Sequence, residues 1–272
     1  QRSVSSNTRK CSLFIATWEA ALTRNTTFKV LSTLSSRGVE HLLMGGQACI
    51  LYGGAEFSRD TDVAILSTDA NFKKLRYALD DLRAACIAVP PFLPEYLDRG
   101  HAVHFRCYRD DVKDMRLDVM SVMRKVDSFT ALWKRRTTME IPGIAVQLLS
   151  LPDLVIAKKT QRDKDWFMIK NLLDANYRQN RENPSEEQMN FWLKEMRTPE
   201  LLCEIALENP SCLEKNIAKR PLLKSALAGN ISNLRTLLVE EENIEREKDR
   251  AYWLPLRKEL EMLDHRFQIR KD

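Results

Sequence analysis

The pattern of hydrophobic and polar positions changes about two thirds of the way along the chain. Up to about residue 178, short runs with alternating or β-branched apolar residues stand between segments with helical spacing. Beyond residue 185 the strand signals stop, and apolar residues recur only at the three- and four-residue spacing of helices. This order predicts an α+β fold, with a mixed sheet flanked by helices and an all-helical C-terminal region.

Strands are expected over residues 39–44, 58–66 and 101–108, and a charged turn at 109–114 predicts 115–123 as the hairpin partner of 101–108. A second hairpin is expected around Pro142-Gly143, from residues 137–141 and 144–149. Helices are expected over residues 13–21, 26–36, 47–52, 70–83 and 152–175, the last with a break near 161–163.

A polar segment, residues 178–184, is the expected linker between two domains, residues 1–178 and residues 185–272. Ser185 followed by Gln188 has the spacing of a capping box, which predicts a helix start. Helices are then expected over residues 186–197, 200–207, 220–228 and 230–266.

The composition is that of an ordinary globular protein, with 272 residues, 44% of them hydrophobic and 30% charged. No apolar run approaches the roughly 20 residues that cross a bilayer, and the first ten residues lack a signal-peptide core. Six cysteines form no CxxC pair, so we expect buried thiols, such as Cys49 and Cys86, in a reducing cytoplasm. A formal charge of +5 weakly favours polyanionic partners, although a mixed-charge surface would look similar.

Gly45-Gly46 lies where a predicted strand meets a predicted helix. Glycines at such a position let the backbone approach a ligand, and the free N–H groups of a helix start favour phosphate oxygens. A Gly-Gly pair is more often only a turn, so this motif alone is weak.

Two further segments carry carboxylates on predicted strands. Asp60 and Asp62 are two residues apart and so project from the same face, about 7 Å from each other. Two such carboxylates repel unless a cation lies between them, and Mg²⁺ prefers carboxylate oxygens. Asp118 has apolar neighbours and is predicted to be largely buried, where it would bind metal or pair with Arg116 or Arg106. An exposed strand is the alternative explanation of the Asp-x-Asp pair.

The ordered combination resembles the nucleotidyltransferase superfamily, and within it the small bacterial branch of antibiotic nucleotidyltransferases and toxin–antitoxin nucleotidyltransferases. Residues 28–66, FKVLSTLSSRGVEHLLMGGQACILYGGAEFSRDTDVAIL, are similar to the helix–strand–Gly-Gly–helix–Asp-x-Asp unit of that branch. Residues 151–173, LPDLVIAKKTQRDKDWFMIKNLL, are similar to the helix that closes such domains. The resemblance covers about residues 26–175 and leaves out the helical tail.

The resemblance implies an enzyme that moves a nucleotide from an NTP to an acceptor with two Mg²⁺ ions. Asp60 and Asp62 would bind both ions, and Asp118 would bind one of them and help to deprotonate the acceptor. Gly45 and Gly46 would hold the triphosphate. Lys158 would reach the phosphates, unless it lies on a solvated helix face, as is expected for Lys159. Arg59 would contact phosphate or form a surface ion pair.

One departure concerns the residue after the first glycine, because many members of the superfamily have Gly-Ser where this chain has Gly-Gly followed by Gln47. Phosphate contact would then depend on backbone N–H groups. The branch resemblance suggests tRNA as an acceptor, and a non-catalytic nucleotide- or partner-binding module on the same fold is the alternative. The oligomeric state is left open.

The remaining candidate residues are expected to have structural roles. His101 and His104, three apart on a strand, face opposite sides and are expected to have packing roles. Trp166, Phe167 and Trp192 are expected in the core, and the basic segments 134–136 and 215–224 on a solvated surface.

Overall fold

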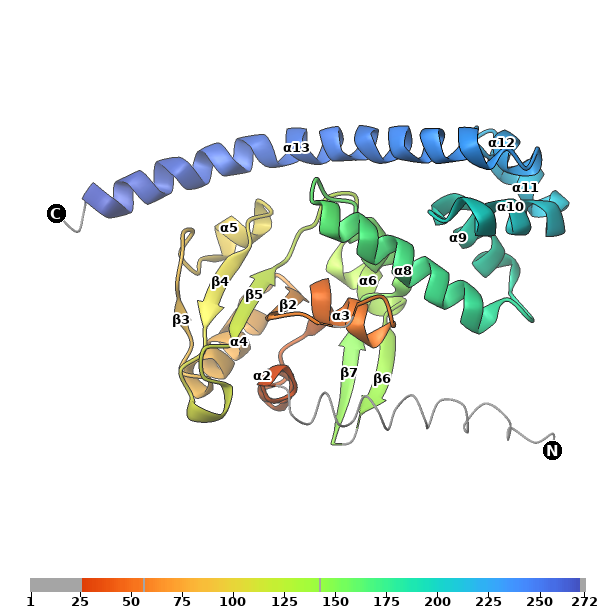
Figure 1. The fold of residues 1–272 in the computed structure, drawn as a ribbon. Helices are drawn as coiled ribbons and strands as arrows, with labels where there is room; N and C mark the ends of the chain where they lie inside the picture. The colour runs from red at the N-terminus through yellow and green to blue at the C-terminus, as the bar shows by residue number, and fades with distance from the viewer. Residues whose placement is uncertain (1–25, 56, 142, 270–272) are drawn as a thin grey trace, which may run out of the picture.

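The computed structural model describes residues 26–55, 57–141 and 143–269 (Figure 1). The helix expected over residues 13–21 lies outside them. The described chain forms one mixed sheet with helices on both faces, followed by a series of helices, so the α+β architecture is confirmed. Within the described residues, none of the helices combines the length and the apolar character that crossing a lipid bilayer would need.

The sheet has seven strands in the order β3-β4-β5-β2-β1-β7-β6. Strand β2 pairs with β5 in parallel and with β1 in antiparallel orientation, and both predicted hairpins, β4–β5 and β6–β7, are present. The strands are β1 (His41–Met44), β2 (Asp60–Ile65), β3 (Ala85–Cys86), β4 (Val103–Arg106), β5 (Arg116–Met120), β6 (Thr137–Ile141) and β7 (Ile144–Leu148).

The two faces of the central strands differ in chemistry. In β2, Thr61 and Val63 are fully buried, and the Thr61 hydroxyl donates a hydrogen bond of 3.2 Å to Thr27 of α2 (Thr26–Ser36). Asp60 and Asp62 alternate with them and face the other side. Helix α4 (Asp69–Asp81) buries Leu75 and Leu79, and Leu82 follows it into the same core. The face of the carboxylates is flanked by α3 (Gly45–Leu51), α7 (Leu151–Ala157) and α8 (Asp163–Asn180).

The helical region begins at the predicted capping box, which is complete: the Ser185 hydroxyl accepts from the Gln188 N–H, and the Gln188 side chain accepts from the Ser185 N–H. Helix α8 continues to Asn180 and so includes the first three residues of the expected linker. The following helices are α9 (Glu186–Glu195), α10 (Pro199–Glu208), α11 (Pro210–Ile217), α12 (Leu223–Leu227) and α13 (Ile231–Ile269).

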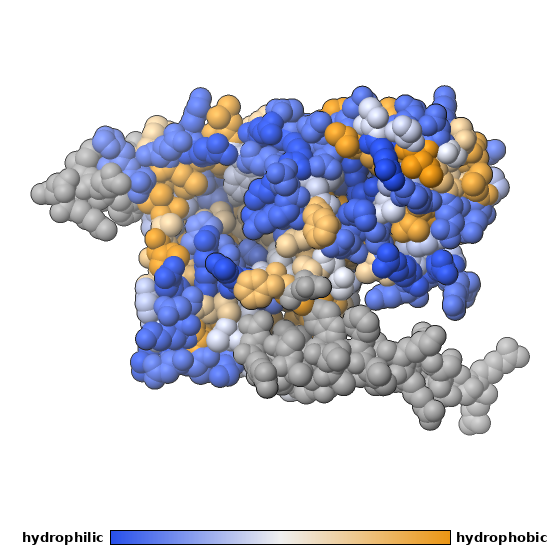
Figure 2. Space-filling view, viewed as in Figure 1, coloured by the Kyte–Doolittle hydropathy of each residue, from blue (hydrophilic) through white to orange (hydrophobic). Residues whose placement is uncertain are grey.

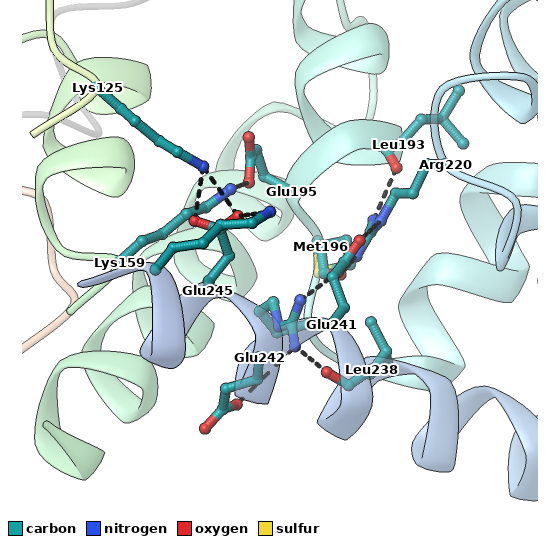
Figure 3. A network of polar contacts seen from close by, with 12 residues as sticks. Lys125, Lys159, Leu193, Glu195, Met196, Arg220, Leu238, Glu241, Glu242 and Glu245 are labelled. Atoms are coloured by element: carbon teal, nitrogen blue, oxygen red, sulfur yellow. Dashed lines mark hydrogen bonds and ion pairs between the residues drawn. The ribbon is translucent and has the colours of Figure 1, made fainter. Parts of the chain in front are cut away.

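Helix α13 runs back over the first part of the molecule along most of its length (Figure 1). Near its start, a polar network joins it to the other tail helices: buried Arg220 donates to the Leu193 carbonyl at 2.8 Å and pairs with Glu241, also at 2.8 Å (Figure 3). Further along, Glu245 pairs with Lys125 of the first part at 2.9 Å. The division into residues 1–178 and 185–272 stays a prediction. Helix α13 belongs to the second range and contacts the first through the ion pair of Glu245 with Lys125.

Several expectations about individual side chains are wrong. Cys86 is exposed, because β3 is a two-residue strand at the sheet edge. Phe167 is 65% exposed, whereas Trp166 and Trp192 are buried as expected. Arg220, expected on a solvated surface, is buried. In the view of Figure 2, hydrophilic and hydrophobic side chains are interspersed, with groups of hydrophobic ones both at the helical end and at the opposite end of the molecule.

Candidate active site

The three predicted carboxylates lie on neighbouring parallel strands. Asp62 of β2 is the register partner of Asp118 of β5, and Asp60 lies two residues earlier on the same face. All three line one cavity of about 970 Å³. Gly45, Gly46, Arg59 and Lys158 line it as well, so the structure brings every predicted site residue to a single place.

Asp118 is held by two neighbours through one oxygen. Its Oδ1 lies 2.9 Å from Nδ1 of His104 and accepts a hydrogen bond of 2.8 Å from Nε of Arg116. Arg116 was one of the two predicted partners, and the other, Arg106, is exposed. His104 was not predicted to take part. Pairing the predicted hairpin symmetrically about the turn at 109–114 would have placed Phe105 opposite Asp118. The observed register is shifted by one residue, so His104 is the register partner of Asp118.

The two central carboxylates have opposite pKa shifts. Burial, reinforced by the negative charge of Asp118, raises the pKa of Asp62 from 3.8 to about 6. Burial alone would also raise the pKa of Asp118, but the hydrogen bonds from His104 and Arg116 outweigh it and lower that pKa. At neutral pH the site therefore contains a carboxylate, Asp62, whose charge is poorly compensated.

Positions 45 and 46 both require glycine, because neighbouring side chains lie too close to leave room for a Cβ. Gly45 has φ +67°, and a Cβ at this position would lie 1.9 Å from Oδ2 of Asp62. A Cβ on Gly46 would lie 2.4 Å from Oγ of Ser58. The Gly46 N–H donates to Asp62 and lowers its pKa, which partly offsets burial. These glycines therefore seat the carboxylate of Asp62 against the start of α3, and their role toward a triphosphate stays a prediction.

Gln47 has a structural role that the sequence comparison with Gly-Ser proteins did not suggest. Its side chain is 2% exposed, and its amide donates to the carbonyl of Ser58 at 3.0 Å. This bond connects α3 to the segment that leads into β2, so it fixes the position of Asp60 and Asp62 relative to the glycines.

Lys158 lies deep in the site and is not on a solvated helix face. Its side chain is 9% exposed and pairs with Asp165 at 3.0 Å, and its charge lowers the pKa of Asp62. Lys159 pairs with Glu195 at 2.5 Å and is also not solvated. Arg59 is exposed at the cavity edge, with its guanidinium 6.0 Å from the ring centroid of Phe57.

The donor set suits a hard divalent cation. Carboxylate oxygens are the ligands that Mg²⁺ prefers, and the raised pKa of Asp62 reports the uncompensated charge that a cation would neutralise. Within the described residues, however, no three His, Cys, Asp or Glu side chains converge as a metal cluster. Oδ1 of Asp118 is instead directed at Arg116 and His104. Metal binding by the trio therefore stays a prediction.

The wall of the cavity opposite the sheet comes from distant parts of the chain. The segment that joins α7 to α8 contributes Thr160, Gln161 and Arg162. Helix α13 contributes Asp249, Trp253, Arg257 and Leu260. The helical tail therefore takes part in the same cavity as the carboxylates.

Comparisons with known proteins find likeness in structure only. No protein-family model matches the chain, and no curated protein matches it significantly. The solved structures that it resembles include two described as nucleotidyltransferases or nucleotidyltransferase-like. A crystal structure of an antigenic nucleotidyltransferase-like protein from Paracoccidioides brasiliensis has a TM-score of 0.38 and 19% identity, over 75% of this chain and 90% of the other. A putative nucleotidyltransferase from H. pylori has a TM-score of 0.38 and 13% identity, over 85% of this chain and 97% of the other. The case for a particular chemistry comes from the side chains of the site.

Proposed function

We propose that the protein is a metal-dependent nucleotidyltransferase, which transfers a nucleotide from an NTP to an acceptor. The observation that carries this proposal is the register of β2 and β5, which places Asp62 beside Asp118 and Asp60 on the same face of one large cavity. Basic side chains line the same cavity, as a triphosphate would require.

Each residue has a distinct part in the proposed reaction. Two Mg²⁺ ions would lower the pKa of the attacking hydroxyl and stabilise the departing pyrophosphate. Asp60 and Asp62 would hold both ions, and Asp118 would hold one. His104 and Arg116 orient Asp118 by fixing its Oδ1. Arg59 at the edge and Lys158 in the interior would contact phosphate oxygens.

The proposal is tested with each NTP labelled at its α-phosphate, incubated with Mg²⁺ and with total RNA or a metabolite extract as acceptor. We expect labelled product, reduced at least about 100-fold by Asp62→Asn, because loss of one carboxylate leaves two close cations under-neutralised. Asp80→Asn, at an exposed position on α4, is the matched control and should leave labelling unchanged. Equal labelling by wild type and Asp62→Asn would contradict the assignment.

A non-catalytic nucleotide-binding module is a second candidate, favoured by the contacts of two site residues. Oδ1 of Asp118 is directed at His104 and Arg116, and Lys158 is bound to Asp165. This candidate predicts NTP binding by calorimetry without labelled product under any acceptor condition. For the enzyme, tRNA as acceptor and a cytoplasmic location are proposals that follow from the resemblance.

A further inference from the structure

The turn between α7 and α8, residues 158–162, begins with the lysine that would contact the phosphates. Four of its side chains line the cavity: Lys158, Thr160, Gln161 and Arg162. In Figure 1 this α7–α8 turn lies at the start of α8, beneath α13. The contacts that hold the turn therefore decide where Lys158 lies relative to a bound nucleotide.

Three consecutive backbone carbonyls of the α7–α8 turn each accept a hydrogen bond from a side chain. The pairs are Lys159 with Nη2 of Arg124, Thr160 with Nε1 of Trp166 at 2.7 Å, and Gln161 with Nη1 of Arg246 at 2.8 Å. The last carbonyls of a helix have no partner within that helix, and those that follow α7 find theirs elsewhere in the molecule. The donors come from the segment after β5, from α8 and from α13, so the path of the turn is fixed from three sides.

Helix α13 binds both backbone polar groups of Gln161. The N–H of Gln161 donates to Oδ2 of Asp249 at 2.9 Å, and its carbonyl accepts from Arg246. Asp249 is 2% exposed and also accepts from Nε of Arg124 at 3.0 Å. Arg246 pairs in addition with Asp163, at 2.7 Å. The tail therefore holds the turn by its backbone, whatever the side chain at position 161.

On its other side the turn is held by Asp165, which is fully buried. This carboxylate accepts from Nζ of Lys158 at 3.0 Å, from the Thr160 hydroxyl at 2.5 Å and from Nε of Arg162 at 2.7 Å. Burial alone would raise the pKa of Asp165, but the charges of Lys158 and Arg162 outweigh it and lower that pKa. An ammonium group has three donors, so Lys158 keeps two for the phosphate oxygens of a ligand.

The contact with α13 lies close to Lys158 along the chain. Gln161 follows Lys158 by three residues, and the carbonyls of the two residues between them are bound as well. A donor stabilises a phosphate only within hydrogen-bond distance, and a misplacement of about 1 Å can cost about 100-fold in rate. Arg246 is not among the described residues that line the cavity, so its hydrogen bonds reach a nucleotide only through the turn.

Resting on the proposed function, we propose that Arg246 and Asp249 are positioning residues for NTP binding. Through the backbone of Gln161 they hold the α7–α8 turn, and the turn holds Lys158 at the triphosphate. The helical tail is thus part of the nucleotide site. Loss of its contact with the turn weakens NTP binding even where the tail does not touch the nucleotide.

The test measures binding of each of the four NTPs by calorimetry, with Mg²⁺ and without acceptor. Arg246→Gln should weaken binding at least about 5-fold, because the turn loses its contact with α13. The matched control is Arg250→Gln, which removes the same charge from α13 one turn later. It breaks only the exposed pair with Glu247 and should leave NTP binding unchanged.

A double-mutant cycle distinguishes positioning of Lys158 from a general structural effect. Lys158→Gln alone should weaken NTP binding about 10-fold or more, since it removes a charge-assisted hydrogen bond. If Arg246 acts through Lys158, adding Arg246→Gln to Lys158→Gln should weaken binding less than about 2-fold further. Effects that add in full would show that Arg246 acts independently of the lysine.

An uncharged variant tests the same turn without altering the electrostatic field. Trp166→Phe removes only the donor to the Thr160 carbonyl and should weaken NTP binding about 2-fold or more. Trp192→Phe is its matched control, because Trp192 is also buried and its indole N–H donates to Asn176 at 2.8 Å, in the helical region. This control should bind NTP as wild type does.

Amide hydrogen exchange of residues 158–165, measured without NTP, reports on the turn itself. Arg246→Gln should speed it and Arg250→Gln should not. Unaltered exchange, or equal NTP binding by these two variants, would overturn the proposal while leaving the proposed function in place. NTP binding that depends on Arg246 and gives no labelled product would instead overturn the proposed function alone. Absence of NTP binding by the wild type would overturn both.

Discussion

Asp62 lies half-buried between the backbone of Gly45 and the side chain of Asp118. Its pKa is raised from 3.8 to about 6, first by burial, so the folded protein favours the protonated form. The resulting loss of stability is absent below about pH 4, develops between pH 4 and 6, and is complete at neutral pH. A bound divalent cation would remove it.

Asp62→Asn should therefore stabilise the metal-free protein at pH 7.5, by up to about 3 kcal/mol in the free energy of unfolding. The gain should shrink toward zero as the pH falls to 4, where wild-type Asp62 is protonated. Urea denaturation in EDTA at several pH values measures both effects. Asp80→Asn serves as control and should change stability by less than about 0.5 kcal/mol. A gain that is constant with pH would show that the charge of Asp62 is not its cause.

Comparing Gly45 with Gly229 separates two costs of adding a Cβ: backbone strain and steric overlap with a neighbouring side chain. Both have positive φ, +67° and +65°, but a Cβ on Gly229 would meet nothing within 4 Å, whereas one on Gly45 would overlap Asp62. We expect Gly229→Ala to cost about 1 kcal/mol, from strain alone, and Gly45→Ala to cost at least about 2 kcal/mol more, because Asp62 must move. Thermal or urea unfolding measures this difference. Equal costs would mean that Asp62 can leave its position freely.

At the scale of elements, α13 contacts residues far back along the chain: Glu259 lies 2.8 Å from Nε2 of His101. The α13 carboxylate of Asp249 is buried against Arg124, whose side chain is itself only 10% exposed. Removing one member of such a pair leaves the other charge buried without compensation.

We expect Asp249→Ala to destabilise the protein by about 3–5 kcal/mol and to speed amide hydrogen exchange in α13 around residues 245–260. Arg250→Ala is the control, since it breaks only the exposed pair with Glu247 and should change stability by less than about 1 kcal/mol. If exchange in α13 is unaltered by Asp249→Ala, other contacts hold the helix over the cavity.

Elements with a strong local signal were predictable and those without one were not. Helix α2 begins and ends where the pattern and Gly38 place it, and Gly38 has the positive φ expected after a helix. Helix α6 (Phe129–Lys134) and strand β3 are too short to show periodicity. Helix α11, which follows α10 after a single residue, Asn209, was not predicted.

At the scale of the whole molecule, the sequence motifs were enough to bring the three carboxylates together. Asp60 and Asp62 follow from strand alternation, and the place of Asp118 follows from the resemblance. The part of α13 that lines the cavity could not be found this way, because nothing in the local pattern around Trp253 says which distant surface it covers. Lys158 was found, but its pairing with Asp165 depends on the turn between α7 and α8, which periodicity does not describe.

The walls of the cavity come from segments far apart in the sequence, so the ribosome synthesises them at different times. The carboxylates are made first, and Asp249, Trp253 and Arg257 follow Asp118 by more than a hundred residues. At the usual pace of a ribosome, about 5–20 residues per second, this delay is on the order of ten seconds. During that interval a growing chain can form the sheet with its acidic cluster open to solvent. The last wall arrives only when synthesis has passed residue 260, so a chain interrupted earlier presents the carboxylates without the helix that encloses them.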